Sequence, residues 1–126
     1  MASEFYPFYF TDRVTFGAAG TGTLTLTVGA TEEFIGEEMI FVVSSGTFAI
    51  EGIRDSSGKA YSSASVTDPI PSAALVTTIA QRTNIGKFSA PLQLVPNTVL
   101  TLDVTGGTSG ATLDIIVRGK KRTVVS

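Results

Sequence analysis

Apolar and polar residues alternate through most of this chain, and a repeat of two residues is typical of a β-strand with one buried face. The stretch TLTLTV places Leu24, Leu26 and Val28 on one face and β-branched threonines on the other. Residues 99–104 and 113–117 repeat this pattern. The alternation predicts an all-β fold, because it covers nearly every long apolar stretch of the 126 residues.

Three segments depart from simple alternation. Residues 39–43 (MIFVV) are continuously apolar, which predicts a central strand covered on both faces. Ile53 falls out of phase after Gly52, which predicts a β-bulge at the glycine. Pro91 interrupts residues 88–94 and predicts an edge strand or a split strand there, since proline cannot donate a ladder hydrogen bond.

Turn signals separate these strands at short intervals. Glycine-rich breaks at residues 17–22 and 106–110, and the sequence DSSG at 55–58, favour a sandwich or a barrel. We expect a single-domain antiparallel β-sandwich. Residues 72–79 (SAALVTTI) are the one candidate helix, with Ser72 as its N-cap, although the same residues also suit a strand.

The composition narrows the possible chemistry. The chain has no cysteine and no histidine, which excludes disulfides, thiol nucleophiles, Cys/His zinc sites and imidazole triads. Paired carboxylates for glycoside hydrolysis remain possible, but no base or cleft can be named and tryptophan is absent. We therefore expect no enzymatic activity and no cofactor.

Charge and hydropathy indicate which classes of partner the chain is expected to lack. The formal net charge is −2 and the pI is about 5.0, so we expect no nucleic-acid partner. The longest apolar run is far shorter than a membrane-spanning segment, so we expect no membrane partner. The sequence MASEFYPFYF has neither the basic region nor the continuous apolar region of a signal peptide, and we expect it to be retained.

Two charged clusters are candidate binding sites. Glu32, Glu33, Glu37 and Glu38 could supply oxygen ligands to a cation, but we favour a solvated strand edge that repels wrong strand partners, and predict no metal site. The second cluster could bind a phosphate or an acidic partner surface, or could be a solvated tail. It consists of Arg118, Lys120, Lys121 and Arg122.

An aromatic segment opens the chain. It consists of Phe5, Tyr6, Pro7, Phe8, Tyr9 and Phe10. Exposed aromatic residues at this density would promote aggregation, so the segment must pack on its own sandwich or on a neighbouring subunit. We favour an extended arm over residues 1–12 that binds a partner, followed by a β-sandwich over residues 13–126.

Three stretches together resemble small virion proteins of tailed bacteriophages. They are the opening EFYPFYF, the middle IRDSSGKAYSSASV, and AQRTNIGKFSAPLQLVPNTVLTLDV with the later VRGKK. The resemblance spans most of the chain. It implies a jelly-roll-like β-sandwich that is a component of the virion, assembled in the host cytoplasm.

The function implied by this resemblance is head decoration. We expect a non-enzymatic cement protein that binds the major capsid protein and itself, with a trimer as the expected oligomer. One alternative is a tail, collar or fibre-base component. A second is a carbohydrate-binding β-sandwich module, which the absence of tryptophan disfavours.

Overall fold

The computed structural model describes residues 4–74, 76–78 and 83–124. These residues form nine β-strands and one short 3-10 helix, Ser72–Ala74. The strands are β1 (Tyr6–Thr15), β2 (Gly22–Thr27), β3 (Glu32–Val43), β4 (Ala49–Asp55), β5 (Ile70–Pro71), β6 (Val76–Thr78), β7 (Thr83–Leu94), β8 (Val99–Thr105) and β9 (Thr112–Thr123). The predicted all-β fold is confirmed.

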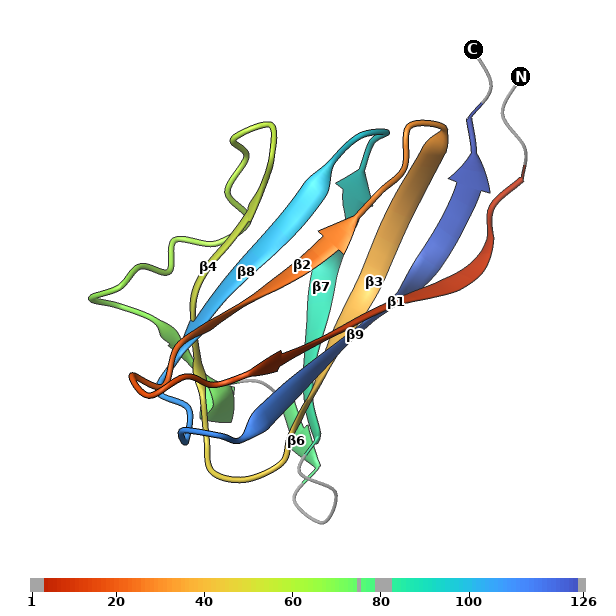
Figure 1. Cartoon of the computed structure of the whole chain (residues 1–126). Coiled ribbons are helices and arrows are strands. Elements are labelled where there is room, and N and C mark those ends of the chain that lie inside the picture. The colour runs from red at the N-terminus through yellow and green to blue at the C-terminus, as the bar shows by residue number, and fades with distance from the viewer. Residues whose placement is uncertain (1–3, 75, 79–82, 125–126) are drawn as a thin grey trace.

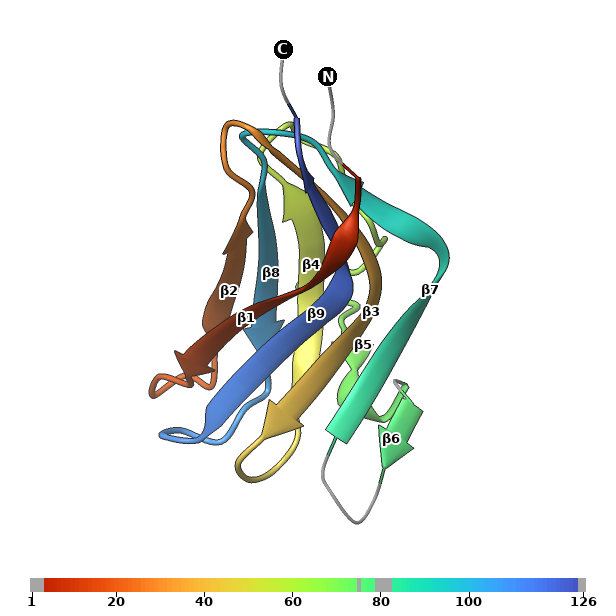
Figure 2. The ribbon, with the colours of Figure 1, turned by 90° about the vertical axis from the view of Figure 1, so that its right-hand side faces the viewer.

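Two antiparallel sheets face each other as a sandwich (Figures 1 and 2). The five-stranded sheet has the order β1-β9-β3-β7-β6, and the four-stranded sheet has the order β2-β8-β4-β5. Along the chain, β1 pairs with β9, β2 with β8, β3 with β7, and β4 with β5. The chain is therefore a long double ribbon rolled so that successive pairs fall in opposite sheets, which is the jelly-roll arrangement.

The facing sides of the two sheets bury the apolar residues that alternate in the sequence. The buried set includes Leu24, Leu26, Val28, Leu100, Leu102, Val104, Leu113, Ile115 and Val117. The residues next to them in the sequence are polar or half-exposed and point to the opposite face of the sheet. The alternation therefore predicted the core-facing side of β2, β8 and β9.

Strand β3 is central, between β9 and β7, as predicted. It is covered on one face only, which corrects the expectation of two covered faces. Met39, Phe41 and Val43 are buried, whereas Ile40 and Val42 lie on the outer face and are half-buried by their neighbours within the sheet. No third layer of described residues covers that face.

Irregular pairing follows the sequence signals. The register of β4 against β8 shifts between Ile50 and Gly52, which confirms the predicted bulge. The pairing of β7 with β3 stops at Lys87 and resumes at Leu92, so the ladder is interrupted around Pro91 although β7 remains one strand between β3 and β6. The pattern of proline and glycine therefore predicted both interruptions.

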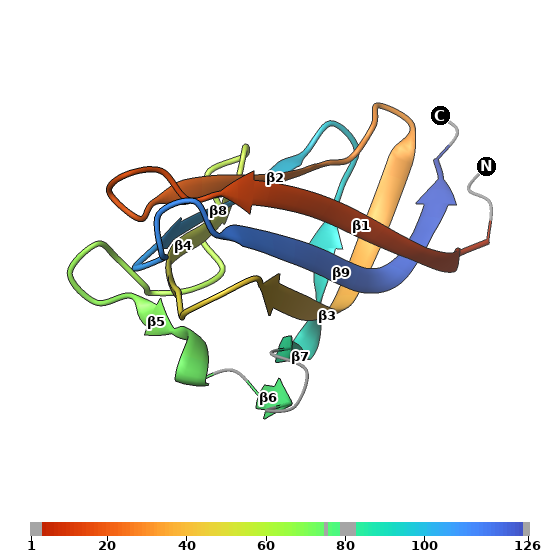
Figure 3. The ribbon, with the colours of Figure 1, turned by 60° about the horizontal axis from the view of Figure 1, so that its bottom comes forward.

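The expected arm over residues 1–12 is not separate from the sandwich, because its residues 6–12 belong to a strand of the five-stranded sheet. Residues 6 to 15 form one continuous strand whose partners run along β9 from Lys121 to Thr112, so there is no boundary at residue 12. The physical reason is that Phe8 and Phe10 share one strand face, and this face packs on the buried ring of Phe34. Figure 3 shows β1 lying beside β9 along its length.

The candidate helix is shorter than residues 72–79. Of the described residues in this stretch, Ser72–Ala74 are helical and Val76–Thr78 form strand β6 against β7. β-branched residues favour this extended continuation. Leu75 and Ile79 lie outside the described residues.

Candidate functional site

The acidic cluster of β3 and the basic cluster of β9 lie side by side and form ion pairs with each other. The pairs are Arg118–Glu38 at 2.6 Å, Lys121–Glu32, and Arg122–Glu33 at 2.6 Å. Among the side chains that the structure describes, Glu37 and Lys120 are the cluster members without an ion-pair partner. Two motifs that each suggested a binding site therefore neutralise one another.

This pairing corrects both earlier interpretations. The glutamates lie on a central strand and do not form a solvated edge, because β9 and β7 flank β3. The basic residues form the second half of β9, which continues to Thr123, and so are not a tail. A hydrogen bond from Lys121 lowers the pKa of Glu32, and the hydrogen bond to Glu38 raises the pKa of Arg118.

The aromatic segment is divided between the core and the surface. Phe8 and Phe10 point inward, where their rings meet Phe34 edge to face at 6.4 and 4.7 Å between centroids. The ammonium of Lys121 lies 4.1 Å from the centroid of Phe8, and only 13% of the Lys121 side chain is exposed. These residues are structural, because their apolar surface is already covered within the chain.

The remaining aromatic residues are available at the surface. Tyr6 is 45% exposed and Tyr9 is 55% exposed. The guanidinium carbon of Arg122 lies 4.5 Å from the centroid of the Phe5 ring. Lys120 is exposed and paired in register with Pro7 on the outer face of the sheet, whereas Tyr6 lies on the face of β1 that carries Phe8. We call Phe5, Tyr6, Pro7 and Lys120 the terminal patch.

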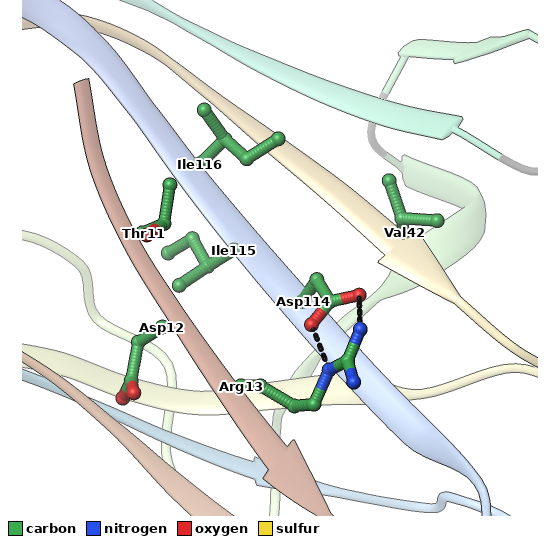
Figure 4. Close-up of a pocket in the computed structure, with 7 residues that line it drawn as sticks. All are labelled: Thr11, Asp12, Arg13, Val42, Asp114, Ile115 and Ile116. Atoms are coloured by element: carbon green, nitrogen blue, oxygen red, sulfur yellow. Dashed lines mark hydrogen bonds and ion pairs between the residues drawn. The ribbon is translucent and has the colours of Figure 1, made fainter.

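A hollow of about 340 Å³ lies on the outer face of β1, β9 and β3 (Figure 4). Thr11, Val42 and Ile116 contribute to its lining. At one end, Arg13 donates two hydrogen bonds to Asp114, at 2.6 and 3.2 Å. This bond raises the pKa of Arg13 and neutralises the charge at the rim.

Asp12 is a polar residue that the sequence analysis did not single out. It lies on the inward side of β1, and its carboxylate accepts a hydrogen bond at 2.9 Å from the backbone N–H of Thr25 on β2. A lone carboxylate among Phe8, Phe10 and Val14 on one strand face was the available signal. Such a residue closes one side of the sandwich by pairing with an edge donor.

Asp55 organises the turn after β4. Its carboxylate accepts hydrogen bonds from the N–H and hydroxyl of Ser57, the N–H of Lys59 and the hydroxyl of Tyr61. These bonds lower the pKa of Asp55 to about 2, with those from Ser57 the largest cause. Burial and the contact with Asp55 raise the pKa of Tyr61 to about 12. The turn is a rigid structural element, since every donor around the carboxylate is used.

The described ranges contain neither a cluster of metal ligands nor a helix able to span a membrane. There, no three acidic side chains gather closely enough to hold a metal ion. No helix among the described residues has the length and apolar character needed to cross a membrane.

Comparison with known proteins adds one likeness. No family model and no curated protein matches the sequence. Among solved structures, the chain is similar to one in a structure of the infectious bursal disease virus Gx strain, with 13% identity and a TM-score of 0.20. The match covers 98% of this chain but 43% of the other, so this chain spans less than half of that protein. A likeness at this TM-score supports no inference about fold or function.

Proposed function

We propose that the chain is a non-enzymatic structural component of a virion and acts as a head decoration protein that binds the major capsid protein. The sequence resemblance to small virion proteins of tailed bacteriophages supports this proposal. The jelly-roll order of the strands agrees with the fold that the resemblance implies. The terminal patch is the observation that carries the proposal, because Tyr6 and Lys120 leave apolar and cationic surface exposed at one end of the sheet.

The patch suits attachment by apolar burial more than by charge. Full burial of an exposed ring stabilises a complex by about 1.5–3 kcal/mol, and Tyr6, which is 45% exposed, can gain roughly half of that. An exposed ion pair made by Lys120 contributes about 0–1 kcal/mol and weakens with salt. The other three basic residues of β9 already have acidic partners, so the net positive charge available for a partner is small.

The described surface favours this proposal over a carbohydrate-binding module. One hollow lies on the outer face of the five-stranded sheet, and another lies beside β4. Neither is lined by an aromatic ring of the kind on which sugars stack. No observation favours the tail, collar or fibre-base alternative.

Co-sedimentation with undecorated heads tests the proposal. Deleting residues 1–10 is unsuitable, because it removes half of β1 together with the core rings of Phe8 and Phe10. Tyr6→Ala removes one ring contact with Phe8 but leaves Phe8 and Phe10 in place, and should weaken binding about three- to tenfold. Lys120→Ala should weaken it about twofold, and only at about 0.05 M salt, where the Debye length is roughly 14 Å.

The matched control is Val66→Ala, which truncates another exposed apolar residue in the loop between β4 and β5. We expect it to bind heads like the original protein. If the original protein does not sediment with heads, or if Tyr6→Ala binds as tightly as Val66→Ala, the proposal is wrong.

A further inference from the structure

The outer edge of β1 has backbone groups that no described residue pairs with. Two hydrogen bonds fix the phase of the ladder: Phe16 N–H donates to the carbonyl of Ala111, and Ser44 N–H donates to the carbonyl of Thr112. Antiparallel ladders alternate, so the even-numbered residues of β1 bond to β9. Tyr9, Thr11 and Arg13 therefore direct their N–H and C=O groups away from the sheet.

We propose that a second copy of this chain pairs with β1 along this edge, antiparallel and around a two-fold axis at Thr11. Thr11 then lies opposite Thr11 of the other copy, and Tyr9 lies opposite Arg13. Pro7 lies opposite Thr15 at each end of the interface. The residues whose backbone groups point outward run from 7 to 15 and are centred on residue 11, so this register uses the whole edge. The missing N–H of Pro7 affects only the two ends of the interface.

Side chains on the outer face fit this register. Each Tyr9 comes to lie beside the guanidinium of Arg13 from the other copy, where an aromatic face attracts a cation. Asp114 already holds Arg13, so the two-fold arrangement does not gather unpaired positive charge. The small side chain of Thr11 leaves the hollow beside Ile116 and Val42 open toward Tyr9 of the second copy. Tyr9 is 55% exposed in the single chain and gains apolar contact there.

The inner face is compatible as well. Phe10 lies opposite Asp12 of the second copy in this register. The carboxylate of Asp12 is held by the N–H of Thr25 below the strand, so it does not point at the new partner. A strand of an unrelated protein would have to accommodate Pro7, Asp12 and Arg13 on this edge, and these residues disfavour such non-specific pairing. A second copy presents the same residues in matching positions, because a two-fold axis places identical surfaces opposite each other.

The proposal gives a dimer and replaces the trimer expected from the sequence. A single strand edge buries an area at the low end of specific interfaces, below about 1,200 Å². The dimer should therefore be weak, and populated at concentrations on the order of 100 µM. The pairing is a property of the isolated protein and does not depend on capsid binding.

Sedimentation velocity over about 5–500 µM tests the proposal. We expect a monomer that converts to a dimer. Thr11→Pro removes only the outward N–H, since residue 11 does not donate to β9, and should weaken dimerisation at least tenfold. Thr11→Val retains the N–H and should leave the dimer unchanged. Tyr9→Ala changes an exposed side chain, and should weaken the dimer even if the proline variant folds poorly.

Amide hydrogen exchange locates the interface. The N–H groups of Tyr9, Thr11 and Arg13 should become protected as the concentration rises. The N–H of Thr23, which points outward from β2 in the same phase as Thr25, should not. A monomer at 500 µM, a trimer, a dimer that tolerates both Thr11→Pro and Tyr9→Ala, or new protection on β2 in place of β1 would overturn the proposal.

Discussion

The carboxylate of Asp12 on β1 and the backbone N–H of Thr25 on β2 form a hydrogen bond of 2.9 Å that joins the edges of the two sheets. The N–H of Thr25 points away from β8, the sheet partner of β2, and donates to Asp12. A side chain thus does at this edge what a neighbouring strand does elsewhere. The contact closes the side of the sandwich where the chain crosses from one sheet to the other.

Replacing Asp12 by alanine should loosen this edge. We expect Asp12→Ala to lower the free energy of unfolding by about 1–2 kcal/mol, because the Thr25 N–H loses its charged acceptor. Asp12→Asn keeps an oxygen acceptor and should cost less. Urea unfolding measures both effects. Exchange of the Thr25 amide should be faster in the alanine variant, and an unchanged rate would show that the contact does not protect it.

Gly119 should not tolerate a side chain. A Cβ atom there would overlap the carbonyl oxygen of Ile35 and lie 2.9 Å from the Cα of Gly36. These are backbone atoms of β3, so they move only if the sheet is distorted. Gly119→Ala should therefore cost about 1–3 kcal/mol of stability by overpacking.

Gly17→Ala is the matched control for that substitution. Gly17 has open space where its Cβ would be and does not adopt a positive φ. Thermal unfolding should show a clear decrease in Tm for Gly119→Ala and little change for Gly17→Ala. Equal Tm values for the two variants would show that β3 and β9 can separate at this point without cost.

Asp55 should make stability depend on pH in the acid range. Its pKa is about 2 in the folded protein against an ordinary 3.8, so the folded state binds the proton more weakly than the unfolded state does. The stabilisation is complete above about pH 4 and is lost as the pH falls toward 2. Asp55→Asn should be about 2 kcal/mol less stable at pH 6, since hydrogen bonds to a charged group are lost.

That difference should shrink as the pH is lowered to 2. Urea unfolding of both proteins at pH 6, 4 and 2 measures it. Tyr61→Phe removes one donor and should produce a smaller version of the same effect. A difference between the original protein and Asp55→Asn that stays constant from pH 6 to pH 2 would contradict the assignment of the low pKa to Asp55.

The pair of Glu38 and Arg118 should couple weakly. A double-mutant cycle with Glu38→Gln and Arg118→Gln should give a small favourable coupling, because the Arg118 side chain is 43% exposed and water screens the pair. The coupling should decrease in 1 M salt. Urea unfolding of the four proteins at two salt concentrations measures it, and a value that does not respond to salt would point to packing as its cause.

The sequence predicted which side chains of a strand point into the core better than it predicted which strands are adjacent. Period-two alternation identifies Leu24 or Leu102 as inward because each residue's direction is a local property of the strand. The pairing of Glu38 with Arg118 joins residues far apart in the chain, and no local pattern states that β3 and β9 are adjacent. Both charged clusters were recognised, but each was interpreted alone.

The aromatic segment was misassigned for a related reason. Phe8, Phe10 and Val14 lie on one face, so the alternation continues through the segment and predicts a strand. The density of aromatic residues around Pro7 favoured an arm in the sequence analysis. Pro7 instead occupies a position whose N–H would face away from β9, where the missing donor costs nothing in the single chain. The Asp12 contact could not be predicted, since it depends on β2 lying beneath β1.

The pairing of β1 with β9 also sets the order in which structure can form during synthesis. The ribosome releases β1 first of all the strands, yet its partners extend from Thr112 to Lys121. Until those residues emerge, Phe8 and Phe10 have no sheet to join, and the nascent chain carries exposed aromatic surface. Such long-range pairing slows folding and favours aggregation of partly made chains. Pairing of β1 with β9 therefore follows the release of β9, and chaperones that bind aromatic segments would act before that pairing.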